Sequence, residues 1–338
     1  MKILLSSYVF SPSVGGIETV SALIGPEFLR AGHEVILVTA TQEQDYLEWP
    51  FPVYRAPARA QLVRLFQWCD VFLQSNISLR FGWPLLFVRR PWIIVHQTWL
   101  EPPDGRWNFR SALKYFLLRY ASNVSISAAI AKALPVPSTI IGNPYSNTIF
   151  KLTNKGPRDR ELVYLGRLVS DKGVDFPIKA LVKLRESGLT PRLTIIGSGP
   201  AEATLRQLAA DLGVDAQVEF TGSKAGEELA GMLNRHQVLV VPSTLPEPFG
   251  IVALEGIACG CVVVASRAGG LPDVVGSCGL TYQIDDLDAL AETLHSILTQ
   301  PILRDQLREN ADRHLAKFCP PVIVGKYLQV LNQATAQR

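Results

Sequence analysis

Short, continuous apolar runs alternate with helical patterns along most of the chain, and this alternation limits the folds open to it. The runs have strand length and are rich in Val, Ile and Leu, and the segments between them have the spacing of amphipathic helices. Strands that are apolar on both faces belong to parallel sheets covered by helices on each side. The alternation therefore predicts an α/β fold built from doubly wound, Rossmann-like parallel sheets.

The alternation occurs twice, once on each side of a polar stretch. The strands predicted in the first half are Lys2–Ser7, Glu34–Ala40, Asp70–Ser75, Trp92–Gln97, Val124–Ser127 and Ser138–Ile141, with a helix over Gly16–Arg30. Those predicted in the second half are Leu162–Leu165, Leu193–Ile196, Val218–Phe220, Val238–Val241 and Val262–Ala265. With 338 residues, the chain is long enough for two domains of about 150 residues each.

The domain boundaries follow from composition. Residues 151–160 are polar, as a linker is, so we expect one Rossmann-like domain over 1–150 and a second over 161–318. Pro320 and Pro321 interrupt the last helical pattern, so residues 319–338 should form a separate helix, redirected by the prolines. Ligands of such sheets bind beyond the carboxyl ends of the strands, which would here flank a cleft between the domains.

Composition excludes several classes of protein. A net charge of +3 is no nucleic-acid signature, and no run of about 18 apolar residues could span a bilayer. The apolar stretch after Met1 stops at Ser6, too early for a secretion signal. The five cysteines form no CxxC pair, which favours free thiols in a reducing compartment. We therefore expect a cytoplasmic protein with no nucleic-acid partner.

The most informative segment is Pro242–Gly260, which follows a predicted strand and opens a helix. Gly250 lets the backbone approach a ligand at the helix start, where free N–H groups and the helix dipole favour a phosphate. Glu247 precedes that helix, and Glu255 lies within it among apolar residues. A carboxylate with apolar neighbours needs polar partners, which the hydroxyl groups of a sugar would supply. A helix-terminal acid and a solvated acid would also account for the pair.

A second cluster ends another predicted strand. Gly166 and Gly173 bracket a loop that contains Arg167 and Lys172. A guanidinium fork beside an ammonium suits a diphosphate, although two surface cations in a polar turn would look the same.

Three further candidates follow predicted strands. Gly15 and Gly16 open the first helix and would admit a phosphate or a sugar. Gly197 lies in a Gly-Ser-Gly turn that could face a nucleobase or ribose, or serve only as a turn. His96 ends an apolar strand, and of the five histidines it is the one we expect to face a ligand.

Some motifs are absent from the sequence. It has no GxxxxGK[ST] loop, no GxSxG elbow and no HExxH pair. No DxD-like acidic pair ends an N-terminal strand, so we expect no metal ion and no other cofactor. The charge of a phosphate would be met by Arg167, Lys172 and a helix N-terminus.

Taken together, these segments resemble the retaining glycosyltransferases of family 4, which have the GT-B fold. The similar segments are the Gly15–Glu18 loop, Gly32-His33-Glu34-Val35, Gly166-Arg167 with Lys172-Gly173, Glu247-Pro-Phe-Gly250 with Glu255 and Cys259-Gly260, and Gly269–Asp273. They occur in the family's order over nearly the whole chain. The resemblance implies an acceptor-binding N-terminal domain, a nucleotide-sugar-binding C-terminal domain and a last helix, over 319–338, that crosses back to the N-terminal domain. One departure is Gln97 after His96, where the family often has an acid.

The resemblance implies a transfer of a sugar from a nucleoside-diphosphate sugar to an acceptor hydroxyl, with retention of configuration, in bacterial polysaccharide or glycolipid synthesis. Arg167 and Lys172 would hold the diphosphate, Glu255 the ribose and Glu247 the sugar hydroxyls, while His96 would lie near the reacting sugar. The implied donor-binding residues are Gly15, Gly16, Gly166, Gly197, Phe249, Gly250, Ile251 and Glu255. A nucleotide-sugar epimerase on the same fold and a non-catalytic nucleotide-sugar-binding relative remain alternatives.

A basic and aromatic stretch suggests a partner for the first domain. Arg106, Arg110 and Lys114 recur every fourth residue among aromatic and apolar side chains, as in helices that lie on anionic bilayers. Residues 81–90 form a second such stretch. The hypothesis is peripheral contact with the inner face of a membrane and a lipid-linked acceptor, and the alternative is that these apolar side chains pack against the sheet.

Overall fold

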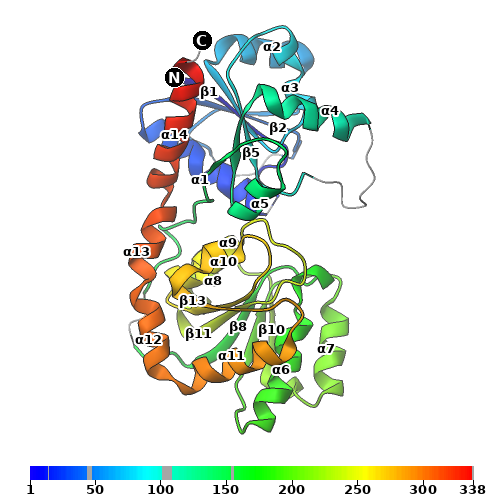
Figure 1. Ribbon diagram of the computed structural model, residues 1–338, viewed down its shortest axis with the longest axis vertical. Helices are drawn as coiled ribbons and strands as arrows, with labels where there is room; N and C mark the ends of the chain where they lie inside the picture. The colour runs from blue at the N-terminus through cyan, green and yellow to red at the C-terminus, as the bar shows by residue number, and fades with distance from the viewer. Residues whose placement is uncertain (14, 44–47, 101–108, 154–155, 337–338) are drawn as a thin grey trace. The chain divides into compact units, whose positions relative to one another are not determined.

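The computed structural model describes residues 1–13, 15–43, 48–100, 109–153 and 156–336, which divide into two α/β units (Figure 1). Unit 1 comprises Met1–Pro144 and Phe318–Arg338, and unit 2 comprises Tyr145–Lys317. The change of unit falls ahead of the stretch 151–160 that was expected to be the linker. That stretch belongs to unit 2 and leads into its first strand.

Unit 1 contains a seven-stranded parallel sheet. Its strands are β1 (Lys2–Ser7), β2 (Glu34–Thr39), β3 (Val53–Arg55), β4 (Val71–Ser75), β5 (Trp92–His96), β6 (Ser122–Ser125) and β7 (Thr139–Ile140). They run in the order β3-β2-β1-β4-β5-β6-β7, and every neighbouring pair is parallel. The strand order reverses between β1 and β4, and open α/β sheets bind their ligands beyond the strand ends at such a point.

Helices cover the sheet of unit 1 on both faces. They are α1 (Gly16–Arg30), α2 (Arg59–Trp68), α3 (Leu79–Gly82), α4 (Phe109–Leu117) and α5 (Ala128–Ala133), with short 3₁₀ turns η1 (Trp83–Leu86) and η2 (Leu118–Tyr120). One apolar core cluster under these helices includes Leu4, Phe72 and Ile94 from the sheet. The sheet therefore has a buried face that fixes its register.

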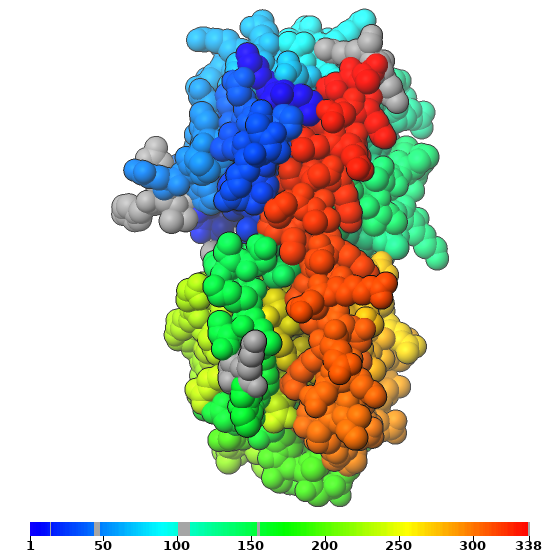
Figure 2. All heavy atoms as spheres, turned by 90° about the vertical axis from the view of Figure 1, so that its left-hand side faces the viewer, coloured from blue at the N-terminus to red at the C-terminus, as the bar shows by residue number. Residues whose placement is uncertain are grey.

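The last helix of the chain, α14 (Pro320–Ala336), also belongs to unit 1. It lies beside α1 (Figure 2). The rings of Tyr327 in α14 and Phe28 in α1 are 6.4 Å apart. Tyr327 is fully buried. The helix begins at Pro320, since proline is well tolerated in the first turn of a helix and poorly tolerated in its interior.

Unit 2 repeats the architecture with a six-stranded parallel sheet in the order β10-β9-β8-β11-β12-β13. Its strands are β8 (Arg160–Leu165), β9 (Leu193–Ile196), β10 (Val218–Gly222), β11 (His236–Val241), β12 (Val262–Ser266) and β13 (Gly279–Tyr282). Its strand order reverses between β8 and β11.

The helices of unit 2 complete a separate core. They are α6 (Asp175–Glu186), α7 (Glu202–Asp211), α8 (Gly226–Arg235), α9 (Ile251–Ala258), α10 (Leu271–Val275), α11 (Leu287–Thr299), α12 (Pro301–Glu309) and α13 (Ala311–Leu315). Strands and helices share one apolar cluster that includes Leu162, Ile178 and Leu294. In the part of the chain that the structure describes, no helix has both the length and the apolar character needed to cross a bilayer.

The predicted elements are largely confirmed, and the differences are shifts of one or two residues in some strand bounds and two edge strands that were not predicted. β1 and α1 have the predicted bounds, whereas β6 begins two residues before its predicted start. The edge strands β3 and β13 were not predicted. β3 has only three residues, and β13 begins at a glycine, which disfavours strands.

Candidate functional site

The strand order of unit 2 brings the two most informative loops side by side. β8 leads into the loop of Gly166–Gly173, β11 leads into the loop of Pro242–Gly250, and the two strands are neighbours. The loops touch directly, since the backbone N–H of Thr244 donates to the carbonyl of Asp171 over 3.1 Å. Gly173 has φ of +62°, and a Cβ there would lie 2.1 Å from the carbonyl oxygen of Pro242. Only glycine fits this contact.

A second close backbone approach joins β8 to β9 at the same edge. Gly197 has φ of +149°, and a Cβ on it would lie 1.8 Å from the carbonyl oxygen of Gly166. Gly166 also has a positive φ and donates its N–H to Ile196. The predicted site residues Gly166 and Gly197 are therefore in close backbone contact at the carboxyl ends of adjacent strands, where neither has a side chain.

Lys172 and Glu247 form an ion pair across the two loops. The hydroxyl of Ser243 donates to the same carboxylate oxygen, Oε1, over 2.8 Å. The loop that follows β12 holds the backbone of Glu247, because Gly270 donates its N–H to the carbonyl of Glu247 over 2.8 Å. The two side chains are 23% and 14% exposed, so the pair is positioned at the surface and still open to a ligand.

Arg167 is an exposed cation beside this pair. Its backbone is fixed, because the buried hydroxyl of Tyr164 donates to the carbonyl of Arg167 over 2.9 Å. Its guanidinium forms no hydrogen bond or ion pair with the residues that the structure describes. Burial and the nearby carboxylates raise the pKa of Tyr164, so its hydroxyl remains a donor at neutral pH. A positioned backbone and an unpaired guanidinium are suited to binding an anion.

The helix α9 starts at the same edge with its first N–H groups uncapped. Gly250 precedes it with φ of +98°, and no side chain caps the helix. A Cβ on Gly250 would lie 2.4 Å from the side chain of Leu271. Phe249 is buried and Ile251 is half-buried, which leaves the backbone at the helix start as the polar surface. Such a terminus attracts negative charge.

Glu255 lies one turn into α9, with a carboxyl group in an apolar setting. Ala253, Leu254 and Ile257 are buried around it, and burial raises the pKa of Glu255 to about 7. No described residue forms a hydrogen bond or ion pair with its carboxyl group. A carboxyl group in this state gains from hydroxyl partners.

The remaining predicted site residues, Gly15, Gly16 and His96, belong to unit 1. Gly15 precedes α1, and the carboxylate of Glu18 folds back toward it, so that a Cβ on Gly15 would lie 2.7 Å from Glu18 Oε2. This carboxylate disfavours a phosphate there and is compatible with sugar hydroxyls. His96 ends β5, is buried, and bonds Asn123 Oδ1 through Nε2 over 2.9 Å.

Some residues that shape the site were not singled out from the sequence. They are Tyr164, Ser243 and Asn123, and each acts through one hydrogen bond to a predicted residue or its backbone. Ser243 lies within the Pro242–Gly260 segment and could have been found there. Tyr164 and Asn123 lie inside strands, where a polar group is not distinguishable from ordinary strand composition.

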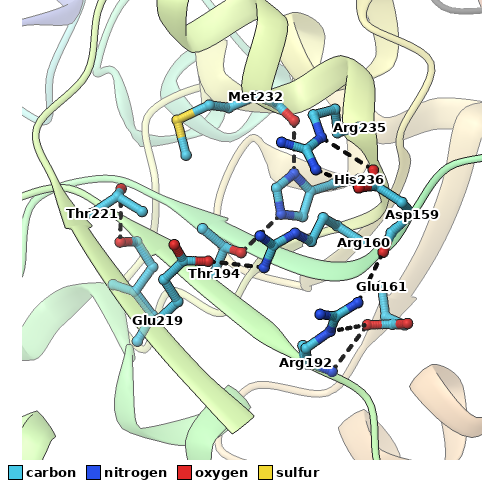
Figure 3. Close-up of polar contacts among 11 residues, drawn as sticks. Asp159, Arg160, Glu161, Arg192, Thr194, Glu219, Thr221, Met232, Arg235 and His236 are labelled. Carbon is cyan, nitrogen blue, oxygen red and sulfur yellow. Dashed lines mark hydrogen bonds and ion pairs between the residues drawn. The ribbon is translucent and has the colours of Figure 1, made fainter.

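Charged residues at the amino ends of the unit 2 strands are paired with one another (Figure 3). Arg160 bonds Glu219 at 2.9 Å, Arg235 pairs with Asp159, and His236 uses both ring nitrogens, on Met232 O and Thr194 Oγ1. These groups are satisfied internally, which is typical of a structural network. The described residues also include no group of three or more His, Cys, Asp or Glu side chains that could hold a metal ion.

Two Rossmann-like parallel-sheet units define the GT-B class of protein, and comparison with known proteins agrees with it. Residues 146–314, half of the chain, match the family described as "Glycosyl transferases group 1". The chain belongs to this family. The matched region contains the loops and helix of the unit 2 site.

Similar proteins of known description point the same way. A GDP-mannose-dependent alpha-(1-6)-phosphatidylinositol monomannoside mannosyltransferase of Mycolicibacterium smegmatis is 35% identical over 198 residues, 56% of this chain and 52% of its own. A D-inositol 3-phosphate glycosyltransferase of Saccharomonospora viridis is 33% identical over 52% of this chain and 43% of its own. The chain thus matches about half the length of these relatives.

A solved structure has the same fold over nearly the whole chain. Anabaena HepE, in complex with UDP and glucose, has a TM-score of 0.80 at 20% identity, covering 98% of this chain and 99% of its own.

Proposed function

We propose that the chain is a metal-independent, retaining glycosyltransferase of family 4 that transfers a sugar from a nucleoside-diphosphate sugar to an acceptor hydroxyl. The observation that carries the proposal is the carboxyl edge of unit 2. It combines the unpaired Arg167, the Lys172–Glu247 pair and the uncapped start of α9. Membership of the glycosyltransferase family and the nucleotide complexes of proteins with this fold support the same reading.

The donor would be held at this edge by complementary charge. Arg167, Lys172 and the first N–H groups of α9 would bind the diphosphate, whose charge then needs no metal ion. The carboxyl group of Glu255 would accept hydrogen bonds from the ribose hydroxyls, and that of Glu247 would accept hydrogen bonds from the hydroxyls of the sugar. Lys172 would also hold Glu247 in place, because the two side chains are already paired.

The reaction would proceed on one face of the sugar. As the bond from the anomeric carbon to the diphosphate oxygen breaks, the acceptor oxygen bonds to that carbon from the same side. The departing diphosphate oxygen takes the acceptor proton, so no protein nucleophile is needed. Arg167 and Lys172 would stabilise the negative charge that grows on the leaving group.

A donor panel tests the proposal. The pure protein is incubated with UDP-glucose, GDP-mannose and ADP-glucose, with and without sugar acceptors and in the presence of EDTA. We expect release of one nucleoside diphosphate and an α-configured product from an α-configured donor. An inverted product contradicts retention, loss of activity in EDTA contradicts metal independence, and an altered free nucleotide sugar indicates an epimerase.

We also propose that unit 1 contacts an anionic membrane that presents a lipid-linked acceptor in polysaccharide or glycolipid synthesis. Phe109 is 80% exposed and Tyr120 is 65% exposed, and no residue of α4 is buried. Leu86 and Phe87 are each 77% exposed, and both stretches cover the same apolar core. Of the expected basic stripe, Arg110 and Lys114 are described, whereas Arg106 and Trp107 lie outside the described residues.

Sedimentation with vesicles tests this contact. The alternative that the apolar side chains of α4 pack against the sheet holds only for some of them, since Phe116 is 46% exposed. We expect binding to vesicles with anionic lipid at low salt, and at least about 100-fold weaker binding when Arg110, Lys114 and Arg119 are all changed to Glu, because each basic residue contributes about 1 kcal/mol. Unchanged binding of that variant would contradict the contact and favour a soluble acceptor.

A further inference from the structure

The side chain of Asn123 in β6 has a fixed orientation. Its Nδ2 group donates to the carbonyl of Leu118 over 2.9 Å and to that of Ala121 over 3.0 Å. Both partners are carbonyl oxygens and can only accept. Turning the amide round would set Oδ1 against two carbonyls, so Oδ1 must be the atom that faces His96.

This orientation determines where the proton of His96 lies. Asn123 Oδ1 is 2.9 Å from His96 Nε2, and an amide oxygen can only accept. His96 Nε2 must therefore be the N–H donor. Burial lowers the pKa of His96, and the hydrogen bond to Asn123 only partly opposes that shift. The ring is then neutral at neutral pH, and Nδ1 keeps a bare lone pair.

The register of the sheet explains why these two residues meet. Asn123 lies directly opposite Ile94 on the neighbouring strand β5. Because side chains alternate along a strand, Ile94 and His96 share one face of the sheet, and Asn123 is on that face too. His96 Nδ1 forms no hydrogen bond with any residue that the structure describes.

We propose that Asn123 is a positioning residue, which holds His96 in the Nε2–H tautomer so that Nδ1 accepts a hydrogen bond from a hydroxyl of the bound sugar. The proposal rests on the proposed function, sugar transfer by a member of this family, in which His96 is implied to lie near the reacting sugar. Asn123 itself touches no substrate. It acts by preventing the Nδ1–H tautomer, which would present a donor where the hydroxyl needs an acceptor.

The chain contains a matched histidine for comparison. His236 is also buried and hydrogen-bonded to a residue of another strand of its sheet, yet its Nδ1 faces the carbonyl of Met232 at 2.7 Å and must be the donor. Its Nε2 accepts from the hydroxyl of Thr194 over 2.9 Å, so neither nitrogen is left for a ligand. His236 should therefore be the Nδ1–H tautomer, the opposite of His96.

Nuclear magnetic resonance tests the tautomers directly. Long-range ¹H–¹⁵N spectra of the full chain distinguish the two neutral forms of imidazole, and His96→Gln and His236→Gln assign the signals. We expect Nε2–H for His96 and Nδ1–H for His236. An Nδ1–H signal for His96 overturns the proposal, and this readout does not depend on turnover or on the donor.

Kinetics test whether Asn123 acts through His96. Nucleoside diphosphate release from UDP-glucose or GDP-mannose is measured for Asn123→Ala, with Thr194→Val as the matched control. We expect the turnover of Asn123→Ala to fall about tenfold, because one neutral hydrogen bond is lost. The turnover of Thr194→Val should stay within twofold of the wild type.

The double variant separates positioning from a structural role. Adding Asn123→Ala to His96→Gln should cause no further loss of turnover, since the positioned ring is already gone. A further tenfold loss would show that Asn123 acts only through the carbonyls of Leu118 and Ala121 and would overturn the proposal. A wild-type protein inactive with every donor would contradict the proposed function instead, and the tautomer result would still stand.

Discussion

The two sheets have similar strand orders, but the loops after β8 and β11 in unit 2 differ in chemistry from the end of β5 in unit 1. In unit 2 the loops after β8 and β11 present Arg167, Lys172 and Glu247, all charged. At the end of β5 in unit 1 the polar groups are neutral: His96 and Gln97 are buried, and the amide of Asn143 donates to Gln97 Oε1 over 2.9 Å.

This difference separates the effect of the fold on the location of a site from the effect of the side chains on the ligand that suits it. In both units the strand order reverses beside the first strand, and a ligand is expected at that point in a sheet of this kind. Charged groups suit a diphosphate, because they offer charge-assisted hydrogen bonds. Neutral donors and acceptors suit hydroxyl groups. The comparison therefore supports the proposal that unit 2 binds the nucleotide and that the end of β5 in unit 1 binds uncharged hydroxyls.

The largest expected effect comes from removing charge from the unit 2 edge. Arg167→Ala or Lys172→Ala should each lower turnover by about 10²–10³, through lost stabilisation of the leaving diphosphate. Nucleotide affinity, measured by calorimetry with UDP and GDP, should fall as well. Near-normal kinetics in both variants would contradict the proposal that the charged loops of unit 2 bind the diphosphate.

A cation at the other end of the same sheet is the control for that experiment. Arg192 pairs with Glu161 at 3.7 Å, at the amino ends of the strands (Figure 3). Arg192→Ala should leave turnover and nucleotide affinity within twofold of the wild type, since exposed ion pairs contribute little.

How far the sequence predicts this protein depends on the kind of feature. Continuous apolar strands and their helices were predictable, because burial on both faces leaves a pattern in the residues themselves. β3 was missed, because a three-residue edge strand has too few residues to show one. The glycine, cation and glutamate loops of unit 2 could be singled out, because their residue types are unusual directly after a strand.

Contacts between distant residues could not be predicted from the sequence. That Lys172 pairs with Glu247 follows from β8 and β11 being neighbours, which only the sheet order reveals. That Asn123 meets His96 depends on the register of β5 and β6. Such contacts leave no local pattern, since each partner is ordinary in its own segment.

A pH effect on stability distinguishes Glu255 from the exposed carboxylates. Burial raises its pKa from the ordinary 4.5 to about 7, so the folded chain holds a proton that the unfolded chain releases. The free energy of unfolding should therefore fall as pH rises from about 4.5 to about 7, by up to about 3 kcal/mol from this group. Urea unfolding of the wild type and Glu255→Gln at pH 5 and pH 8 measures this contribution.

The outcome has a direct control. Glu255→Gln should be more stable than the wild type at pH 8 and close to it at pH 5, whereas Glu292→Gln on the exposed face of α11 should track the wild type at both. Equal stability of Glu255→Gln and wild type at pH 8 would mean that the Glu255 carboxylate is not disfavoured in the fold.

The smallest effects should separate the two glutamates of unit 2. In Glu247→Gln the amide oxygen can still accept hydrogen bonds from Ser243 and Lys172, so Lys172 stays in place. The affinity for free UDP or GDP should therefore hardly change. Use of the intact donor should fall about tenfold, because one hydrogen bond to the sugar is weakened.

Glu255→Gln should instead weaken the binding of free nucleotide by about the same factor, because it loses an acceptor for ribose hydroxyls. Calorimetry with the nucleoside diphosphate measures the effect on nucleotide binding, and kinetics with the whole donor measure the effect on use of the sugar. If the variants exchange these phenotypes, the sugar lies nearer α9 than the loop before it, and the donor is bound in the reverse direction along the edge.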